Sequence, residues 1–198
     1  MNEALLRPLI WMDYRLAIIF TAIAPLLLLI WALWKRKEAV YKLLIIYWRV
    51  ASLLLITLYL LIPGWKIGFF SGIAAKILIA LTLWFWVDLN EEIKDFPQSA
   101  LKLAFTSWRW AVTLYCSIGA IASLISLPCG WSDAAIESNV CQVWLEVPQV
   151  YRALIHPTPG NEGFLGFMGA MGLTVYILYF AYFLLVRLGK QGRSALEQ

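Results

Sequence analysis

Apolar residues along this chain are grouped into five long runs, and polar residues are concentrated between the runs. A helix needs about 20 apolar residues to cross a hydrocarbon core about 30 Å thick, and each run reaches or approaches that length. The pattern therefore predicts an all-α fold, a polytopic membrane bundle of about five transmembrane helices in a single domain over residues 1–198. The predicted spans are residues 16–34, 43–62, 67–87, 109–127 and 164–186.

Prolines and polar residues mark the segments between and within these runs. Residues 1–15 mix charged with bulky apolar side chains, which predicts a short interfacial segment that is broken near Pro8. Residues 128–163 form the longest connection, and their several prolines predict a loop. Pro25 lies inside the first predicted span, where a proline indicates a kink whose freed backbone groups are satisfied by neighbouring helices.

Composition supports the membrane assignment and narrows the expected partners. Hydrophobic residues make up 62% of the chain and charged residues 14%, whereas soluble domains carry about 25% charged residues. The net charge of +4 is modest, and the basic residues lie at the ends of apolar runs instead of forming a basic stripe. We therefore expect the lipid bilayer and other membrane protein subunits as partners, and no nucleic acid. A bound lipid or pigment is an additional partner that this composition allows.

The basic residues also predict an orientation. If the N-terminus lies outside, eleven Lys and Arg residues belong to the inside ends and connections, and four belong to the outside. Basic residues are enriched in the loops that stay in the cytoplasm. This distribution predicts that the N-terminus and residues 128–163 face a lumen or periplasm and that the C-terminus is cytoplasmic.

The cysteines suggest a cross-link but no metal site. Cys116 lies within the fourth predicted span, where it is expected to act as a small apolar residue. Cys129 and Cys141 both fall in the outer connection, and outer compartments are commonly oxidising. We predict a disulfide between them, with two free thiols as the alternative. No further Cys or His completes a metal ligand set with the usual spacing.

A single histidine, His156, limits the chemistry that the chain can perform. A haem held between helices usually needs two axial ligands, and no nucleophile motif accompanies this histidine. We therefore expect no catalytic residue, no metal and no cofactor. The expected role of His156 is that of a hydrogen-bonded surface residue, and the alternative is a ligand to a pigment or metal.

Lys76 is the one ionisable residue expected near the middle of a span. Gly68 and Gly72 precede it at four-residue steps, so the three residues are predicted to share one helix face that another helix approaches closely. An ionisable residue at this depth faces protein or water and is a candidate functional site. The alternative is a structural pair, or a side chain that extends toward the outer surface.

Two further sets of residues are expected to hold the helices together. A strip of glycines at three-residue steps begins the fifth span and predicts close helix packing. Charged residues near the inside ends of three spans predict an ion network that is mainly structural. The strip consists of Gly163, Gly166, Gly169 and Gly172, and the network of Arg49, Asp88, Glu91 and Arg109.

Several stretches resemble a family of small cyanobacterial membrane proteins that is known only as a domain of unknown function. They are residues 7–17 (RPLIWMDYRLA), residues 46–52 (IYWRVAS), and the outer connection with Trp144-Leu145-Glu146 and His156-Pro157. The resemblance implies an oxygenic phototroph and a thylakoid membrane, whose lumen would receive residues 128–163. It supplies no catalytic or cofactor residues.

These observations favour a non-catalytic accessory or assembly factor of photosynthetic or other thylakoid membrane complexes, which binds them through helix faces and the outer connection. The alternative is a small carrier or channel centred on Lys76. An enzyme acting on lipid or isoprenoid substrates is a third class, but it requires paired acidic motifs, and the chain offers only one acidic group, at residues 88–95.

Overall fold

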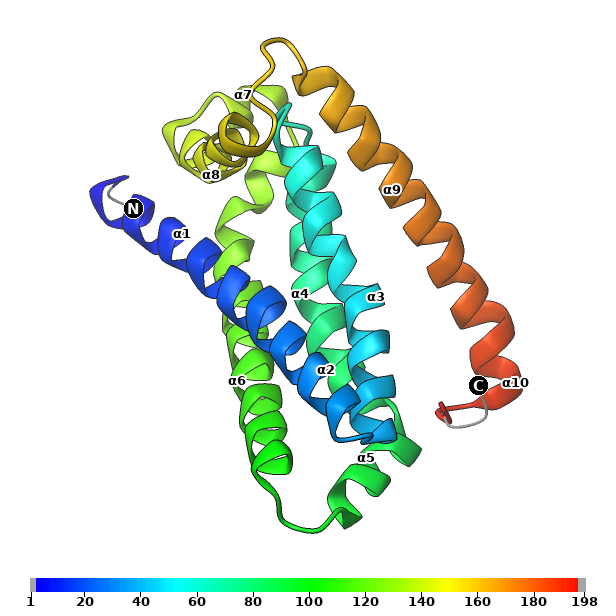
Figure 1. The fold of residues 1–198 in the computed structure, drawn as a ribbon. Coiled ribbons are helices and arrows are strands. Elements are labelled where there is room, and N and C mark those ends of the chain that lie inside the picture. The colour runs from blue at the N-terminus through cyan, green and yellow to red at the C-terminus, as the bar shows by residue number, and fades with distance from the viewer. Residues whose placement is uncertain (1–2, 196–198) are drawn as a thin grey trace.

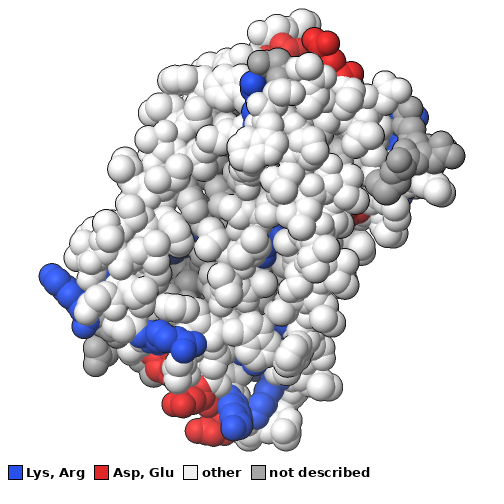
Figure 2. Space-filling view, turned by 180° about the vertical axis from the view of Figure 1, so that it is seen from behind, with Lys and Arg blue, Asp and Glu red and all other residues white. Residues whose placement is uncertain are grey.

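The computed structural model describes residues 3–195, and every regular element in that range is a helix (Figure 1). Within this range, five helical stretches are long and apolar enough to cross a membrane, so the predicted bundle of five spans is confirmed as a fold class. In the view of Figure 2, charged side chains gather mainly toward the two ends of the molecule, and a largely uncharged band lies between them. The five stretches are Leu5–Trp34, Glu38–Leu61, Ile67–Phe85, Ala100–Gly130 and Glu162–Lys190.

The first stretch is one continuous helical rod made of α1 (Glu3–Ala17), the π-helix η1 (Ile18–Ile23) and α2 (Ala24–Trp34). The expected break near Pro8 is absent, and Pro8 lies inside α1. Pro8 is near the start of the helix and exposed, so the only backbone bond lost is the one to the carbonyl four residues earlier. The rod runs obliquely across the bundle in Figure 1.

Where the sequence predicts a kink at Pro25, the structure has a π-helix, η1, which ends two residues before this proline. Proline has no N–H, so the carbonyls of Phe20 and Thr21 lose their partner in the π and α registers respectively. Trp108 Nε1 donates to the Phe20 carbonyl at 2.9 Å, and the Tyr47 hydroxyl donates to the Thr21 carbonyl at 2.9 Å. Neighbouring helices therefore supply the donors that the proline removes.

Three helices form the centre of the bundle: α3 (Glu38–Leu61), α4 (Ile67–Phe85) and α6 (Ala100–Ser123). The fourth span begins earlier than predicted, because Ser99 accepts a hydrogen bond from the Lys102 N–H and so caps α6. Trp86 is extended and separates α4 from the short helix α5 (Val87–Asp95). The main core cluster includes Tyr47, Phe105, Leu43, Leu44, Ile79 and Leu83, all fully buried.

Residues 124–155, which we call the end segment, are mainly helical, although the sequence predicted a loop from residue 128 onward. They form the 3-10 helix η2 (Leu124–Gly130), α7 (Asp133–Ile136) and α8 (Asn139–Ile155). Ser138 caps α8, and Pro148 lies within it. One face of α8 buries Val143 against Leu6 and Ile10 of α1, which is why this segment folds onto the bundle.

The fifth span comprises α9 (Glu162–Tyr182), the π-helix η3 (Phe183–Arg187) and α10 (Leu188–Gln191). In Figure 1, α9 lies near α3 at the end of the molecule that carries α8 and diverges from the bundle toward its other end. Beyond α10 the chain returns to the bundle, where Val87 N–H donates to the Arg193 carbonyl at 3.3 Å and Ala195 is buried.

Candidate functional site

Lys76, which is buried, forms an ion pair with a partly buried residue that the sequence did not single out, Asp13 of α1. Lys76 Nζ lies 2.9 Å from Asp13 Oδ2, and only 8% of Lys76 is exposed. The ammonium group also donates to Ser123 Oγ at 3.1 Å and to the Gly119 carbonyl at 3.4 Å, both on α6. Three acceptors match the three donors of an ammonium group, so the charge of Lys76 is fully satisfied.

Asp13 is held equally well on its other side. The Tyr115 hydroxyl lies within hydrogen-bond distance of Asp13 Oδ1, at 2.9 Å, and of the Asp13 carbonyl, at 3.0 Å. The cluster of Asp13, Lys76, Tyr115 and Ser123 therefore joins α1, α4 and α6 at one level of the bundle. Removing one partner of a buried pair leaves an uncompensated charge and costs about 3–5 kcal/mol. Such an arrangement fixes the relative position of the three helices.

Asp13 was missed because residues 1–15 were expected to lie at the interface as a separate segment. The same residues continue without interruption into the first span, so Asp13 is part of the bundle. A usable signal was present: Asp13 is the only carboxylate between Ala4 and Trp34, and a buried lysine requires a counter-charge.

The glycine that makes room for Lys76 is Gly119, which the sequence analysis also missed. A Cβ placed on Gly119 would lie 3.2 Å from both Cδ and Nζ of Lys76. Gly68 and Gly72 serve another contact: a Cβ on Gly68 would meet Leu61 at 2.7 Å, and one on Gly72 would meet Thr57 at 3.3 Å. Four-residue steps drift around a helix, so the two glycines face α3 while the lysine side chain reaches α6 and α1.

The expected network of Arg49 and Arg109 with acidic residues is replaced by separate contacts. Arg109 donates to the side-chain oxygen of Asn90 and stacks on Trp84, with its guanidinium carbon 4.0 Å from the ring centroid. Arg49 donates to the Tyr179 hydroxyl of α9 at 3.3 Å. A planar guanidinium binds aromatic faces and neutral oxygens as well as carboxylates, so charge counting alone did not identify these partners.

The acidic members of that network also lie elsewhere. Asp88 Oδ2 accepts hydrogen bonds from Ser194 Oγ at 2.9 Å and from the Ala195 N–H at 2.5 Å, and so anchors the returning C-terminal segment to α5. Glu91 is exposed on α5.

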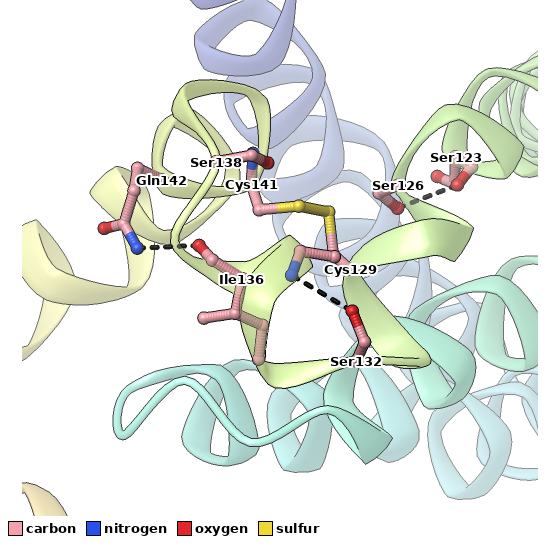
Figure 3. Close-up of a disulfide and its surroundings, with 9 residues drawn as sticks. Ser123, Ser126, Cys129, Ser132, Ile136, Ser138, Cys141 and Gln142 are labelled. Carbon is pink, nitrogen blue, oxygen red and sulfur yellow. Dashed lines mark hydrogen bonds between the residues drawn. A yellow bond between two sulfur atoms is a disulfide. The ribbon is translucent and has the colours of Figure 1, made fainter.

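Cys129 and Cys141 are joined by a disulfide that links η2 to α8 (Figure 3). Their Cα atoms lie 5.7 Å apart, and both residues are buried. Gln142 Nε2 donates to the Ile136 carbonyl at 2.8 Å and closes the same turn. Cys116 is a buried free thiol within α6. The disulfide therefore fixes α8 to η2, which continues the fourth span.

Polar contacts attach the end segment to the other spans. Glu146 accepts from Arg7 in an ion pair of 2.8 Å, and from Trp11 Nε1 at 3.3 Å. Gln149 donates to the Ile62 carbonyl, and Arg152 pairs with Glu162 at 2.7 Å. Residues on α8 thus bind α1, the α3 terminus and the start of α9.

His156 is hydrogen-bonded to Tyr59 and packs against two tyrosine rings. Its Nε2 lies 2.8 Å from the Tyr59 hydroxyl, and its ring packs edge-on against Tyr59 and Tyr151. Burial raises the pKa of Tyr151 to about 12, so this phenol stays protonated at neutral pH. In the described range, no three His, Cys, Asp or Glu residues gather where they could hold a metal ion.

Three of the four glycines in the α9 strip pack against α3 or the turn that follows it. A Cβ on Gly166 would lie 2.5 Å from Pro63 Cγ, and one on Gly169 would lie 3.0 Å from the backbone nitrogen of Leu60. A Cβ on Gly172 would meet Ile56 at 3.2 Å, whereas one on Gly163 would meet nothing within 4 Å. The strip therefore allows close contact between two helix backbones over about two turns.

The chain belongs to a family described as "Protein of unknown function (DUF3177)", which matches residues 7–196. No characterised protein and no solved structure matches the chain.

Proposed function

We propose that the protein is a non-catalytic accessory or assembly factor that binds other membrane protein subunits through α9 and the end segment. The observation that carries this proposal is the exposure of α9. In an apolar stretch of 18 residues within this span, only 6% of the residues are buried within the protein. The glycine strip attaches one face of α9 to α3, and the remaining faces present large apolar side chains, among them Met171, Val175 and Leu178.

The end segment offers a second surface for a partner. Trp131 and Leu154 are each 74% exposed there. The disulfide and the Arg7–Glu146 pair hold the segment in place, so a partner would meet a preformed surface and little ordering entropy would be lost on binding. Large apolar side chains exposed on a rigid surface are typical of sites that bind protein or membrane.

The geometry around Lys76 favours this proposal over a carrier. Transport of a charged solute or proton requires ionisable or polar groups at successive depths. The groups around Lys76 are instead gathered at one level and satisfy one another. Such a pair joins three helices through satisfied contacts and needs no transport role to explain it.

The proposed location is the thylakoid membrane of an oxygenic phototroph. Residues 128–163 and the N-terminus would face the lumen, and the C-terminus would be cytoplasmic. The distribution of basic residues and the resemblance to cyanobacterial proteins support this assignment. Arg7 pairs with Glu146, which is the expected consequence of both segments lying on one side. A disulfide also suits an oxidising lumen.

The test compares bulky substitutions on two exposed helix faces. Val175 of α9 is 63% exposed and Ile118 of α6 is 66% exposed, so Val175→Trp and Ile118→Trp are matched. Tagged variants are expressed in the native membrane, extracted in mild detergent and sized on native gels, with co-purifying subunits identified. We expect Val175→Trp to lose a defined complex that the wild type and Ile118→Trp retain. A wild type that runs alone would overturn the proposal, and so would flux of a solute through the wild-type protein in reconstituted vesicles.

A further inference from the structure

A cavity of about 190 Å³ lies between the diverging part of α9–η3 and the two helices α3 and α4. Its wall is mostly apolar and aromatic, with Val50, Leu81 and Phe180 among the lining residues. Arg49 and Arg187 line the same cavity. Beneath it, the returning chain is fixed by Arg193 Nε, which donates to the Phe85 carbonyl at 2.8 Å. The cavity therefore combines a hydrocarbon-like interior with two cationic side chains.

Arg49 is the unusual member of this lining. It lies eleven residues after the start of α3, which corresponds to about 16 Å along the helix, and it is exposed. Its observed hydrogen bond, to the Tyr179 hydroxyl at 3.3 Å, is to a neutral group, and no described carboxylate forms an ion pair with it. A guanidinium at the lateral surface of a transmembrane helix is costly unless an anion compensates it.

We propose that this cavity binds an anionic phospholipid, with one acyl chain between α9 and the α3–α4 pair and the phosphate on Arg49 and Arg187. The forked guanidinium matches the geometry of phosphate oxygens, which a compact ammonium group does not. A cavity with an apolar wall and a few convergent polar groups is the usual form of a small-molecule site. The π-helix η3, which ends at Arg187, is a local irregularity of the kind that is frequent at such sites.

The divergence of α9 explains why a lipid occupies this position and a side chain does not. The glycine strip draws α9 against α3 near Pro63 and Leu60, and the contact ends near Ile56. Beyond that level the two helices separate, and Arg49 and Tyr179 bond across the gap. An acyl chain from the surrounding bilayer fills the remaining space without exposing polar backbone. This inference does not depend on the accessory role of α9, because a lipid in the cavity leaves the outward face of α9 unchanged.

The test measures lipid binding to the purified full-length protein. Native mass spectrometry in a non-ionic detergent compares phosphatidylglycerol with phosphatidylcholine of identical chains. We expect phosphatidylglycerol to bind at least about tenfold more tightly, and Arg49→Gln to remove about tenfold of that affinity while leaving phosphatidylcholine binding unchanged. Lys35→Gln is the matched control, because it removes one exposed positive charge that does not line the cavity.

A second variant and a label test the acyl-chain part of the proposal. Val50→Phe fills the cavity and is expected to weaken binding of both lipids. Phosphatidylglycerol with a photoreactive group on one acyl chain should label peptides that contain Val50 or Phe180. Equal affinity for the two lipids in the wild type, equal losses for Arg49→Gln and Lys35→Gln, or labelling outside the cavity would overturn the proposal. If Arg49→Gln does not fold, the Val50→Phe measurement and the labelling decide it.

Discussion

The Tyr47 hydroxyl donates a hydrogen bond of 2.9 Å to the Thr21 carbonyl, one of the two carbonyls that Pro25 leaves without a partner. Tyr47 is fully buried, so its hydroxyl also has no access to water. Pro25 leaves the Thr21 carbonyl without a backbone donor, and the buried Tyr47 hydroxyl of α3 donates to that carbonyl. The bond replaces a backbone hydrogen bond with one between helices and couples the shape of the rod to the position of α3.

The first prediction concerns this bond. Tyr47→Phe keeps the ring packing and removes the donor, and interhelical hydrogen bonds in membranes contribute about 0.5–2 kcal/mol. We expect Tyr47→Phe to lower the thermal midpoint in detergent. The control is Tyr182→Phe, at an exposed position of α9, which should leave the thermal midpoint unchanged. In a Pro25→Ala background, which restores the backbone donor, the Tyr47→Phe effect should shrink. Equal effects in both backgrounds would contradict the proposed coupling.

The second prediction concerns the Lys76–Asp13 pair. Lys76→Met leaves the Asp13 carboxylate, whose side chain is 24% exposed, without its counter-charge, so we expect a loss of stability of at most the about 3–5 kcal/mol of a fully buried pair. Adding Asp13→Asn removes that charge and should recover most of the loss, because Tyr115 still has an acceptor. The measurement is a double-mutant cycle: protein abundance and thermal midpoint are compared for the wild type, the two single variants and the double variant. Additive losses would indicate that the two residues act independently.

The number of spans was predictable because the length of an apolar run is a property of each segment alone. The partners of the charged residues were not predictable from such local patterns. Asp13 stands out as the lone carboxylate of the first span, but it is 63 positions from Lys76, and no local pattern indicates that α1 crosses α4 at that level. Arg49 and Arg109 were assigned carboxylate partners on charge, whereas their observed contacts are with Tyr179, Asn90 and Trp84. Contacts between distant segments depend on helix rotation, which composition does not determine.

The end segment shows a second limit. Proline count predicted a loop over residues 128–163, but Pro148 is accommodated within α8. The sequence contains a signal for this helix that proline counting overlooked. Ser138 is a good capping residue, and apolar residues follow it at 140, 143, 144 and 147, a helical spacing. The packing of Val143 against α1 then stabilises the helix.

The third prediction concerns orientation. A reporter fused after Gln198 should be active only if it functions in the cytoplasm, because an outside N-terminus would place eleven of the 16 Lys and Arg residues at the inside ends and connections. The matched fusion carries the same reporter in the connection near Gly160, which is expected on the opposite side. Activity of a periplasm- or lumen-specific reporter at the C-terminus would reject this orientation.

The fourth prediction concerns the disulfide between Cys129 and Cys141. Thiol labelling of unreduced, denatured protein should modify Cys116 alone, and reduction should expose all three cysteines. Cys141→Ser should make the end segment more sensitive to protease, because closing a loop of this size contributes about 3 kcal/mol. Cys116→Ser serves as the control, since it changes a thiol that takes no part in the bridge. Labelling of three thiols without reduction would refute the cross-link.

The fifth prediction separates glycines of α9 that contact α3 from one that does not. Leucine at Gly169 would place its Cβ 3.0 Å from the Leu60 backbone nitrogen, which cannot move without shifting α3. Overpacking of this kind costs about 1–3 kcal/mol, so we expect Gly169→Leu to separate α9 from α3 and lower the thermal midpoint. Gly166→Leu should behave similarly, because its Cβ would meet Cγ of Pro63, and the proline ring is rigid.

Gly163→Leu is the control, because a Cβ at Gly163 meets nothing within 4 Å while the residue belongs to the same strip in sequence. The measurement that follows α9 itself is cross-linking between cysteines introduced at Tyr59 and Ala170, in a background with Cys116 replaced by serine. Wild-type glycines and Gly163→Leu should give the cross-link, and Gly169→Leu should lose it. If all three glycines tolerate leucine equally, α9 is not held to α3 by backbone proximity, and its attachment must come from the Arg49–Tyr179 and Arg152–Glu162 contacts at its two ends.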